Sequence, residues 1–287
     1  MSEDPNRFRL AGVMGWPIGH SRSPLIHNHW LAERGLPGAY VPLAVPPERL
    51  ERALHALSAL GFAGVNLTIP HKVLAVSMVD RMDEAARAIG AVNTIVVGPD
   101  GELAGRNTDA FGFIESVREA QPGVDFSKGP AVVIGAGGAA RAIVHGLLEA
   151  GVPAIRLTNR TLPRAKALAQ DFGRRVEAHP WERRADILGD ASIVVQTTAL
   201  GMSGQPPLDI ALDDLPAAAT VCDIVYTPRR TALLEAAAAR GNPVVEGLGM
   251  LLHQARPAFG AWFGGASHAM PANSPALQAL LDRSLPR

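Results

Sequence analysis

The glycine-rich segment at residues 135–140 has the composition and spacing of a turn that binds a pyrophosphate. Its sequence, Gly-Ala-Gly-Gly-Ala-Ala, fits the pattern G-x-G-x-x-G/A and follows the apolar run 130–134. In such a turn the first glycine permits the sharp bend, the second lets the backbone approach the phosphates, and a small last residue lets the helix pack on the strand. Glycine-rich turns also close ordinary βα units, but the strand–turn–helix context favours a dinucleotide site. Its expected residues are Gly135, Ala136, Gly137, Gly138 and Ala139.

A second segment, Asn159-Arg160-Thr161, stands at the end of the next apolar run, 154–158. An acidic residue there would bond the ribose 2′-hydroxyl, whereas Arg160 offers a planar fork to a 2′-phosphate. Arg164 lies one helical turn further on, where it can clamp the same phosphate or stack on the adenine. The alternative is that Asn159 or Thr161 caps a helix over 163–172 and that both arginines are solvated. The two roles are compatible, so these residues predict NADP as the cofactor and a redox reaction.

Four short polar segments interrupt the first 110 residues, at 21–24, 66–72, 91–94 and 105–109. Each has a purely structural explanation. Ser23 would cap a helix, Lys72 would be a solvated turn residue, Asn93 would be a polar residue in a strand, and Asp109 would favour a helix N-terminus. Taken singly, none of the four indicates a site.

Taken together and in this order, the segments resemble the shikimate dehydrogenase family. The motifs are G-x-P-I-x-H-S-x-S-P at 15–24, N-x-T-I-P-H-K at 66–72, G-A-V-N-T at 90–94, N-T-D at 107–109, G-A-G-G-A at 135–139, N-R-T at 159–161 and G-L-G-M-L-x-x-Q-A at 247–255. The resemblance extends from about Val13 to Trp262. Seven motifs in register make the match specific.

The resemblance implies an oxidoreductase that acts on a CH–OH group with NADP and interconverts 3-dehydroshikimate and shikimate, in the chorismate route to aromatic amino acids. Lys72 matches the family's catalytic lysine, either as the proton donor or as the group that holds the developing charge. Asp109 matches its acidic partner, which would orient Lys72 and accept hydrogen bonds from the substrate's hydroxyls. Because a free lysine has a pKa of about 10.4, a lysine that exchanges protons near neutrality must be tuned or coupled to a partner.

The resemblance also implies the remaining substrate contacts. Ser21 and Ser23 would give their hydroxyls to the substrate carboxylate, with help from Thr68. Asn93 and Gln254 would bond the ring hydroxyls, since a neutral amide both donates and accepts.

On the nucleotide side, Tyr226 is expected to approach the substrate. Further expected cofactor residues, the last two of them near the nicotinamide, are Thr198, Ile224, Gly247 and Met250. Two positions depart from the family pattern. Ala199 lacks the hydroxyl common at this loop, and Glu246 stands where the family often has aspartate.

Two alternatives remain open at this stage. A quinate/shikimate dehydrogenase that uses NAD or NADP would need room for one more ring hydroxyl, and the pair Ser21 and Ser23 does not decide this. A catalytically silent homologue would bind shikimate-like ligands only. The presence of both Lys72 and Asp109 favours an enzyme.

The composition is that of an ordinary globular protein. The chain has 287 residues, 47% of them hydrophobic, and 27 basic residues balance 27 acidic ones, so the charge does not indicate nucleic acid or anionic membranes as partners. A single cysteine, Cys222, excludes a disulfide framework and favours a reducing compartment. The polar N-terminus and the strand-length apolar runs predict neither a signal peptide nor a membrane span. We therefore expect a cytoplasmic monomer or homodimer.

No metal site is expected either. His27 and His29 are two residues apart on a predicted helix and so point in different directions.

The elements predict two α/β domains. Residues 1–112 mix a strand at 10–14, a helix from Ser23 to Gly35 with Ser23 as N-cap, a helix over 47–60, a strand over 64–69, a helix over 73–89 and a hairpin over 92–105. Residues 113–247 alternate strands and helices as in a doubly wound, Rossmann-like NADP-binding domain. After Gly247 the chain is expected to be helical, broken near Pro257 and Pro271. Since the nucleotide domain is complete by then, helices in 248–287 should pack back on the first domain, which binds the substrate.

Overall fold

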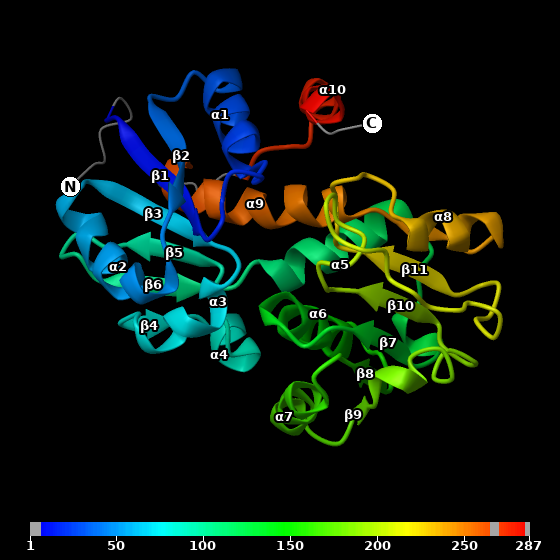
Figure 1. The fold of residues 1–287 in the computed structure, drawn as a ribbon. Coiled ribbons are helices and arrows are strands. Elements are labelled where there is room, and N and C mark those ends of the chain that lie inside the picture. The colour runs from blue at the N-terminus through cyan, green and yellow to red at the C-terminus, as the bar shows by residue number, and fades with distance from the viewer. Residues whose placement is uncertain (1–6, 265–269, 285–287) are drawn as a thin grey trace. The chain divides into compact units, whose positions relative to one another are not determined.

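The computed structural model describes residues 7–264 and 270–284, which fall into two compact α/β units (Figure 1). The first unit contains the chain up to Thr108 together with Gln254–Ser284. The second contains Asp109–His253. No helix within the described ranges is long and apolar enough to cross a membrane.

The first unit is built on a mixed six-stranded sheet with the order β2-β1-β3-β5-β6-β4. Its strands are β1 (Arg9–Gly15), β2 (Gly38–Ala44), β3 (Phe62–Leu67), β4 (Arg81–Met82), β5 (Thr94–Val97) and β6 (Leu103–Arg106). β1 runs parallel to β2 and β3, whereas β5 is antiparallel to β3 and β6. The β5–β6 pair confirms the predicted hairpin. The sequence did not reveal β2, which contains Pro42 and lies at the edge of the sheet, where a missing N–H donor is tolerated.

The helices of this unit are shorter than predicted. They are α1 (Ser23–Glu33), α2 (Leu50–Ala59), α3 (His71–Leu74), α4 (Glu84–Ile89) and α10 (Pro275–Ser284). The single helix expected over 73–89 is wrong, because the chain turns after α3, forms β4 and starts again at α4. The Asp83 carboxylate accepts a hydrogen bond from Ala86 N at 2.7 Å and so begins the new helix.

The start of α1 also differs from the prediction. The N-cap is Arg22, with no side-chain capping bond, and Ser23 is the first helical residue. Pro24 stands in the first turn, where its missing N–H has no consequence. The Ser23 hydroxyl is therefore not used to cap the helix.

The second unit has a fully parallel sheet with the order β12-β11-β10-β7-β8-β9. Its strands are β7 (Ala131–Ile134), β8 (Ile155–Thr158), β9 (Val176–His179), β10 (Ile193–Gln196), β11 (Thr220–Asp223) and β12 (Val244–Val245). In order along the unit this is 3-2-1-4-5-6 read from β9, the doubly wound arrangement of dinucleotide-binding folds. The predicted fold class is confirmed, although β9 was not anticipated.

The helices of this unit are α5 (Asp109–Ala120), α6 (Gly138–Glu149), α7 (Leu162–Phe172), α8 (Ala232–Ala239) and the first part of α9 (Gly247–Phe263). Alternate residues of β7 belong to two different apolar clusters. Val133 packs in the cluster that includes residues of α5, α6 and α7, and Val132 packs in the cluster that includes residues of α8. Strands enclosed on both sides explain the continuous apolar run at 131–134.

The C-terminal helices complete the first unit, as predicted. Trp262 on α9 is fully buried and donates its indole N–H to Ile95 O at 3.0 Å, and Leu277 and Leu281 on α10 are also fully buried. The break expected at Pro257 is wrong, since α9 continues through it. A proline costs the helix one hydrogen bond, and the surrounding buried side chains offset that cost. Near Pro271 the expected break is present, because residues 270–274 are not helical.

Candidate functional site

A polar network in the first unit joins Asn93, Thr108 and Gln254. Asn93 Nδ2 donates to Thr108 Oγ1 at 2.9 Å and to Gln254 Oε1 at 3.4 Å. Asn93 Oδ1 accepts from Thr108 N at 2.9 Å, and Thr108 Oγ1 donates to Gln254 O at 2.9 Å. All three residues are buried. The structure thus brings together the two amides predicted to bind ring hydroxyls, and Thr108, which the sequence analysis did not single out, connects them.

A second chain of hydrogen bonds runs from Ser23 through Tyr40 to Asn66. The Tyr40 hydroxyl donates to Asn66 Oδ1 at 2.7 Å, and Asn66 Nδ2 donates to Asn93 O and Thr94 Oγ1. The Ser23 hydroxyl hydrogen-bonds with Tyr40. Burial raises the pKa of Tyr40 well above its usual value, so this phenol stays neutral. Sequence reasoning missed Tyr40 because it lies on β2.

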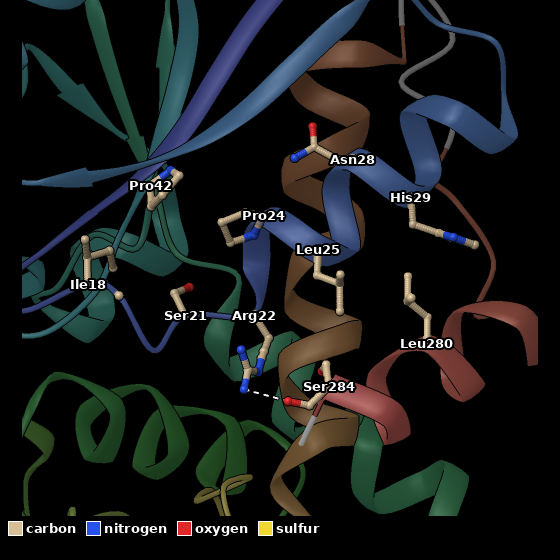
Figure 2. Close-up of a pocket in the computed structure, with 11 residues that line it drawn as sticks. Ile18, Ser21, Arg22, Pro24, Leu25, Asn28, His29, Pro42, Leu280 and Ser284 are labelled. Carbon is tan, nitrogen blue, oxygen red and sulfur yellow. Dashed lines mark hydrogen bonds between the residues drawn. The ribbon is translucent and has the colours of Figure 1, made fainter. Parts of the chain in front are cut away.

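The loop before α1 carries Ser21 beside a cavity of about 520 Å³ (Figure 2). Ser23 N donates to Ser21 Oγ at 3.3 Å, which turns the chain into the helix. Arg22 also lines the cavity, and its Nη2 donates to the last carbonyl of α10, Ser284 O, at 2.7 Å. The loop is therefore held by both α1 and α10.

Thr68 and Lys72 follow the carboxyl end of β3. Thr68 O accepts from His71 N at 2.8 Å, and Lys72 O accepts from Val92 N at 2.8 Å. This second bond holds the backbone of α3 beside Asn93. Six of the residues predicted to bind the substrate belong to the first unit: Ser21, Ser23, Thr68, Lys72, Asn93 and Gln254.

Two predicted residues belong to the second unit instead. Asp109 is the first residue of α5 and is only 3% exposed, and it follows Thr108 directly along the chain. Tyr226 lies in the loop after β11 and is half-buried. The structural explanation considered for Asp109, a place at a helix N-terminus, therefore holds, and its role in the site stays a prediction.

The glycine turn lies at the point where the strand order of the second sheet reverses, between β7 and β10. Gly135 has φ of 118°, and a Cβ there would lie 2.3 Å from Thr197 Oγ1, so no larger residue fits. Gly137 is the N-cap of α6, without a side-chain capping bond, and a Cβ on it would meet nothing within 4 Å. Open space in front of free helix N–H groups fits a bound pyrophosphate.

The segment expected to hold the 2′-phosphate follows β8. Thr161 is the N-cap of α7 but makes no side-chain capping bond, and Asn159 Nδ2 donates to Thr161 O at 2.9 Å. The side chains of Asn159 and Thr161 therefore do not cap α7. Arg160 and Arg164 are exposed and form no ion pair with any described residue. Their guanidinium groups suit a phosphate ligand.

Further cofactor candidates gather at the carboxyl ends of β10 and β11. Gln196 Oε1 accepts from Thr198 N at 2.6 Å, which shapes the loop that carries Thr198. A Cβ on Gly247 would lie 2.5 Å from Ile224 O, so Gly247 must be glycine for Ile224 to pack there. Met250, by contrast, belongs to the apolar core of the unit.

Asp223, which the sequence analysis did not select, fixes this loop. Its Oδ1 accepts from Val225 N at 2.9 Å, and its Oδ2 accepts from Thr231 Oγ1 at 2.7 Å. Burial raises the pKa of Asp223 to about 6, against the two hydrogen bonds that lower it. Neighbouring Glu246 pairs with Arg229 and Arg230, so the loop is tied at both ends.

Within residues 7–264 and 270–284, no group of three His, Cys, Asp or Glu side chains could hold a metal ion. His27 is fully buried and stacks on Tyr40 with ring centroids 4.1 Å apart, and burial lowers its pKa to about 3. Cys222 is buried in β11, and burial raises the pKa of its thiol. Both are core residues.

Comparison with known proteins matches both units to domains of one enzyme family. Residues 13–95 match the shikimate dehydrogenase substrate binding domain, and residues 118–203 match the family described as shikimate / quinate 5-dehydrogenase. Shikimate dehydrogenase (NADP(+)) from Paramagnetospirillum magneticum is 57% identical over 258 residues, covering 90% of this chain and 94% of that protein. The enzyme of the same name from Rhodospirillum rubrum is 56% identical, covering 91% and 93%.

Solved structures agree. Shikimate 5-dehydrogenase from Thermus thermophilus, in complex with NADP(H) and shikimate, is 37% identical with a TM-score of 0.83, covering 96% of this chain and 100% of that one. Quinate dehydrogenase from Corynebacterium glutamicum, in complex with NAD, is 30% identical with a TM-score of 0.86, covering 96% and 100%. With both of its units matched and relatives above 55% identity over nine-tenths of its length, the chain belongs to the shikimate dehydrogenase family.

Proposed function

We propose that this protein is an NADP-dependent shikimate dehydrogenase that reversibly reduces 3-dehydroshikimate to shikimate in aromatic amino-acid (chorismate) biosynthesis. One observation carries the proposal: relatives that are 57% and 56% identical over nine-tenths of the chain bear this activity and this cofactor in their names. The site supports it, because a lysine, a buried carboxyl and neutral amides suit a small hydroxylated acid.

Residues 113–247, which lie within the second unit, hold NADP in this proposal. Gly135, Gly137 and the N-terminus of α6 receive the pyrophosphate, and Arg160 with Arg164 receives the 2′-phosphate. The free space at Gly137 and the exposed guanidinium groups fit the cofactor. When bound, NADPH supplies the hydride that reduces the ketone. The turn residues Ala136, Gly138 and Ala139, the segment Asn159 and Thr161, and the residues Thr198, Ile224, Gly247 and Met250 complete this proposed site.

Residues 1–112 with 248–287 bind the substrate. As the ketone is reduced, negative charge develops on its oxygen, and Lys72 gives that oxygen a proton or holds its charge. In the oxidative direction Lys72 receives the proton back. In this proposal Asp109 is the acidic partner of Lys72 and accepts hydrogen bonds from the ring hydroxyls, and Tyr226 binds the ring.

Asn93 and Gln254 bind the other ring hydroxyls, and Ser21, Ser23 and Thr68 bind the carboxylate. Because Asn93 already bonds Thr108 through both of its side-chain atoms, its orientation is fixed before the substrate arrives. Such preorganisation lowers the cost of binding. The partner is thus a small molecule. A cytoplasmic location and a monomeric or homodimeric state complete the proposal, with the single buried cysteine as support for a reducing compartment.

The second candidate is a quinate dehydrogenase that uses NAD, which the similarity to the Corynebacterium glutamicum enzyme favours. One experiment separates the candidates. The purified protein is mixed with shikimate or quinate and with NADP⁺ or NAD⁺, and the absorbance of reduced nicotinamide is followed. We expect the highest kcat/KM for shikimate with NADP⁺. A higher kcat/KM for quinate or for NAD⁺ contradicts the proposal, and binding of shikimate without any turnover identifies a silent homologue.

A further inference from the structure

We infer that Gln196 is a positioning residue for the cofactor, because it holds the loop 197–200 so that Thr198 donates a hydrogen bond to the pyrophosphate. The inference rests on the proposed function, since it assumes that a dinucleotide binds at the glycine turn 135–140. Gln196 is the last residue of β10 and is fully buried. A buried amide needs partners for its oxygen and its nitrogen, and those partners show what it holds in place.

The side chain of Gln196 bonds to the backbone of the loop that follows it. Its Oε1 accepts from Thr198 N at 2.6 Å, and its Nε2 donates to Thr198 O at 3.2 Å and to Leu200 O at 2.7 Å. Because a backbone N–H only donates and a carbonyl only accepts, these three bonds allow one orientation of the amide. The conformation of the loop therefore depends on the length and the polarity of this side chain.

The same loop is fastened to the glycine turn. Thr197 N and Thr197 Oγ1 each donate to Ile134 O at 2.8 Å, directly before Gly135. A Cβ on Gly135 would lie 3.0 Å from Thr198 Cγ2, so the Thr198 side chain lies against the turn. The loop and the turn thus meet at the carboxyl ends of β10 and β7, where a doubly wound sheet binds its ligand.

Thr198 has a proton to give to that ligand. Its Oγ1 accepts from Leu200 N at 3.1 Å, which fixes the hydroxyl oxygen, and its own proton is donated to no described residue. A pyrophosphate presents acceptor oxygens only, and hydrogen bonds to an ionised group are stronger than neutral ones. A shorter or apolar side chain at position 196 would release the loop and misplace this hydroxyl.

Asn242 provides a matched control in the same unit. It is also buried, and its Nδ2 also holds a loop through backbone carbonyls, Pro216 O at 2.8 Å and Ala219 O at 3.0 Å. That loop precedes β11, so it lies at the amino ends of the parallel strands, opposite the glycine turn. Gln196→Met and Asn242→Leu each exchange a buried amide for an apolar side chain of similar size, and only the first should affect the cofactor.

Calorimetry with NADP⁺ gives the Kd of each variant. Steady-state kinetics give the Ki of adenosine 2′-monophosphate, which has the 2′-phosphate but no pyrophosphate. We expect Gln196→Met to raise the Kd for NADP⁺ about 10-fold or more, as for one charge-assisted hydrogen bond, and Gln196→Asn to raise it at least about threefold. The Ki should change by less than about twofold in both variants, and Asn242→Leu should leave both constants within about twofold. In a Thr198→Val protein, Gln196→Asn should add less than about twofold, because the hydroxyl that Gln196 positions is gone.

Thermal unfolding shows which variants are folded, and Gln196→Asn carries the test if Gln196→Met does not fold. Four results would show that the amide is only structural: an unchanged Kd in a folded Gln196 variant, an equal rise in Kd and Ki, the same rise in Asn242→Leu, or failure of both Gln196 variants to fold. Additive effects of Gln196→Asn and Thr198→Val would show that Gln196 does not act through Thr198. Each of these results overturns the inference and leaves the proposed function intact, whereas a wild-type protein that does not bind NADP⁺ overturns both.

Discussion

Replacing Asp223 by asparagine should remove the contribution of this carboxyl group to the pH dependence of the unfolding free energy. Asp223 is only 2% exposed, and burial raises its pKa from 3.8 to about 6. The native protein therefore holds this proton more tightly than the unfolded chain does, so the group contributes stability below about pH 4 that is lost as the pH rises through 6. The difference between the two pKa values corresponds to about 3 kcal/mol of unfolding free energy. Asparagine cannot ionise and should show no such loss.

The assay is urea unfolding of wild type and Asp223→Asn at several values between about pH 4.5 and 7.5. Other carboxyl groups titrate in both proteins, so subtracting the two unfolding free energies at each pH leaves the contribution of Asp223. We expect the wild type to lose stability relative to the variant as the pH rises. Asp213→Asn, at an exposed position, is the control and should show a constant difference. A difference that is also constant with pH for Asp223→Asn would refute the argument that burial raises the pKa of Asp223.

The remaining predictions concern catalysis and the cofactor. Lys72→Ala and Asp109→Ala should each lower kcat by about 10²- to 10⁴-fold with little change in thermal unfolding; wild-type turnover in either would remove that residue from the mechanism. Arg160→Ala should raise the KM for NADP⁺ about 10-fold or more while leaving that for NAD⁺ nearly unchanged, as expected for loss of a phosphate contact; equal changes would contradict a 2′-phosphate site. Gly137→Ala should fold normally yet raise the KM for NADP⁺, because its new methyl group enters open space, whereas Gly135→Ala should lower the melting temperature by several degrees, because its Cβ would lie 2.3 Å from Thr197 Oγ1. Equal melting temperatures for the two alanine variants would show that the turn relaxes.

The nucleotide-binding unit was predictable because its signals are local. The glycine turn, the apolar strands and the arginine at 160 each report their role within a few residues, and the parallel order follows from the alternation of strands and helices. Only β9, whose sequence Val-Glu-Ala-His is half polar, was missed in this sheet.

The first unit was less predictable because its contacts are distant in sequence. Strand β2 holds a proline and has no strong alternation, so Tyr40 and its bonds to Ser23 and Asn66 were not anticipated. The apolar spacing at 73–89 suits one helix as well as two, and the choice is made by the Asp83 cap and by pairing with β6. Pro257 was expected to break a helix that tertiary packing instead preserves.

The substrate residues were found through their family motifs, whereas their hydrogen bonds required the fold. Sequence spacing cannot show that Thr108 joins Asn93 to Gln254, or that Tyr40 bonds Asn66. Nor can it show that Asp223, at the end of β11, is buried, since aspartate is mostly exposed in proteins.

The discontinuous first unit has a consequence for how the protein is made. Its last segment, Gln254–Ser284, leaves the ribosome only after residues 109–253 have been synthesised, a delay on the order of ten seconds at typical elongation rates. During that time Trp30 lacks its hydrogen-bond partner Ala272, and Ile95 lacks its partner Trp262 on α9. The second unit, in contrast, is continuous and can fold while the chain is still growing. We therefore expect the N-terminal half of this protein to be the last to acquire its native structure, and to depend during synthesis on protection of its unfinished core.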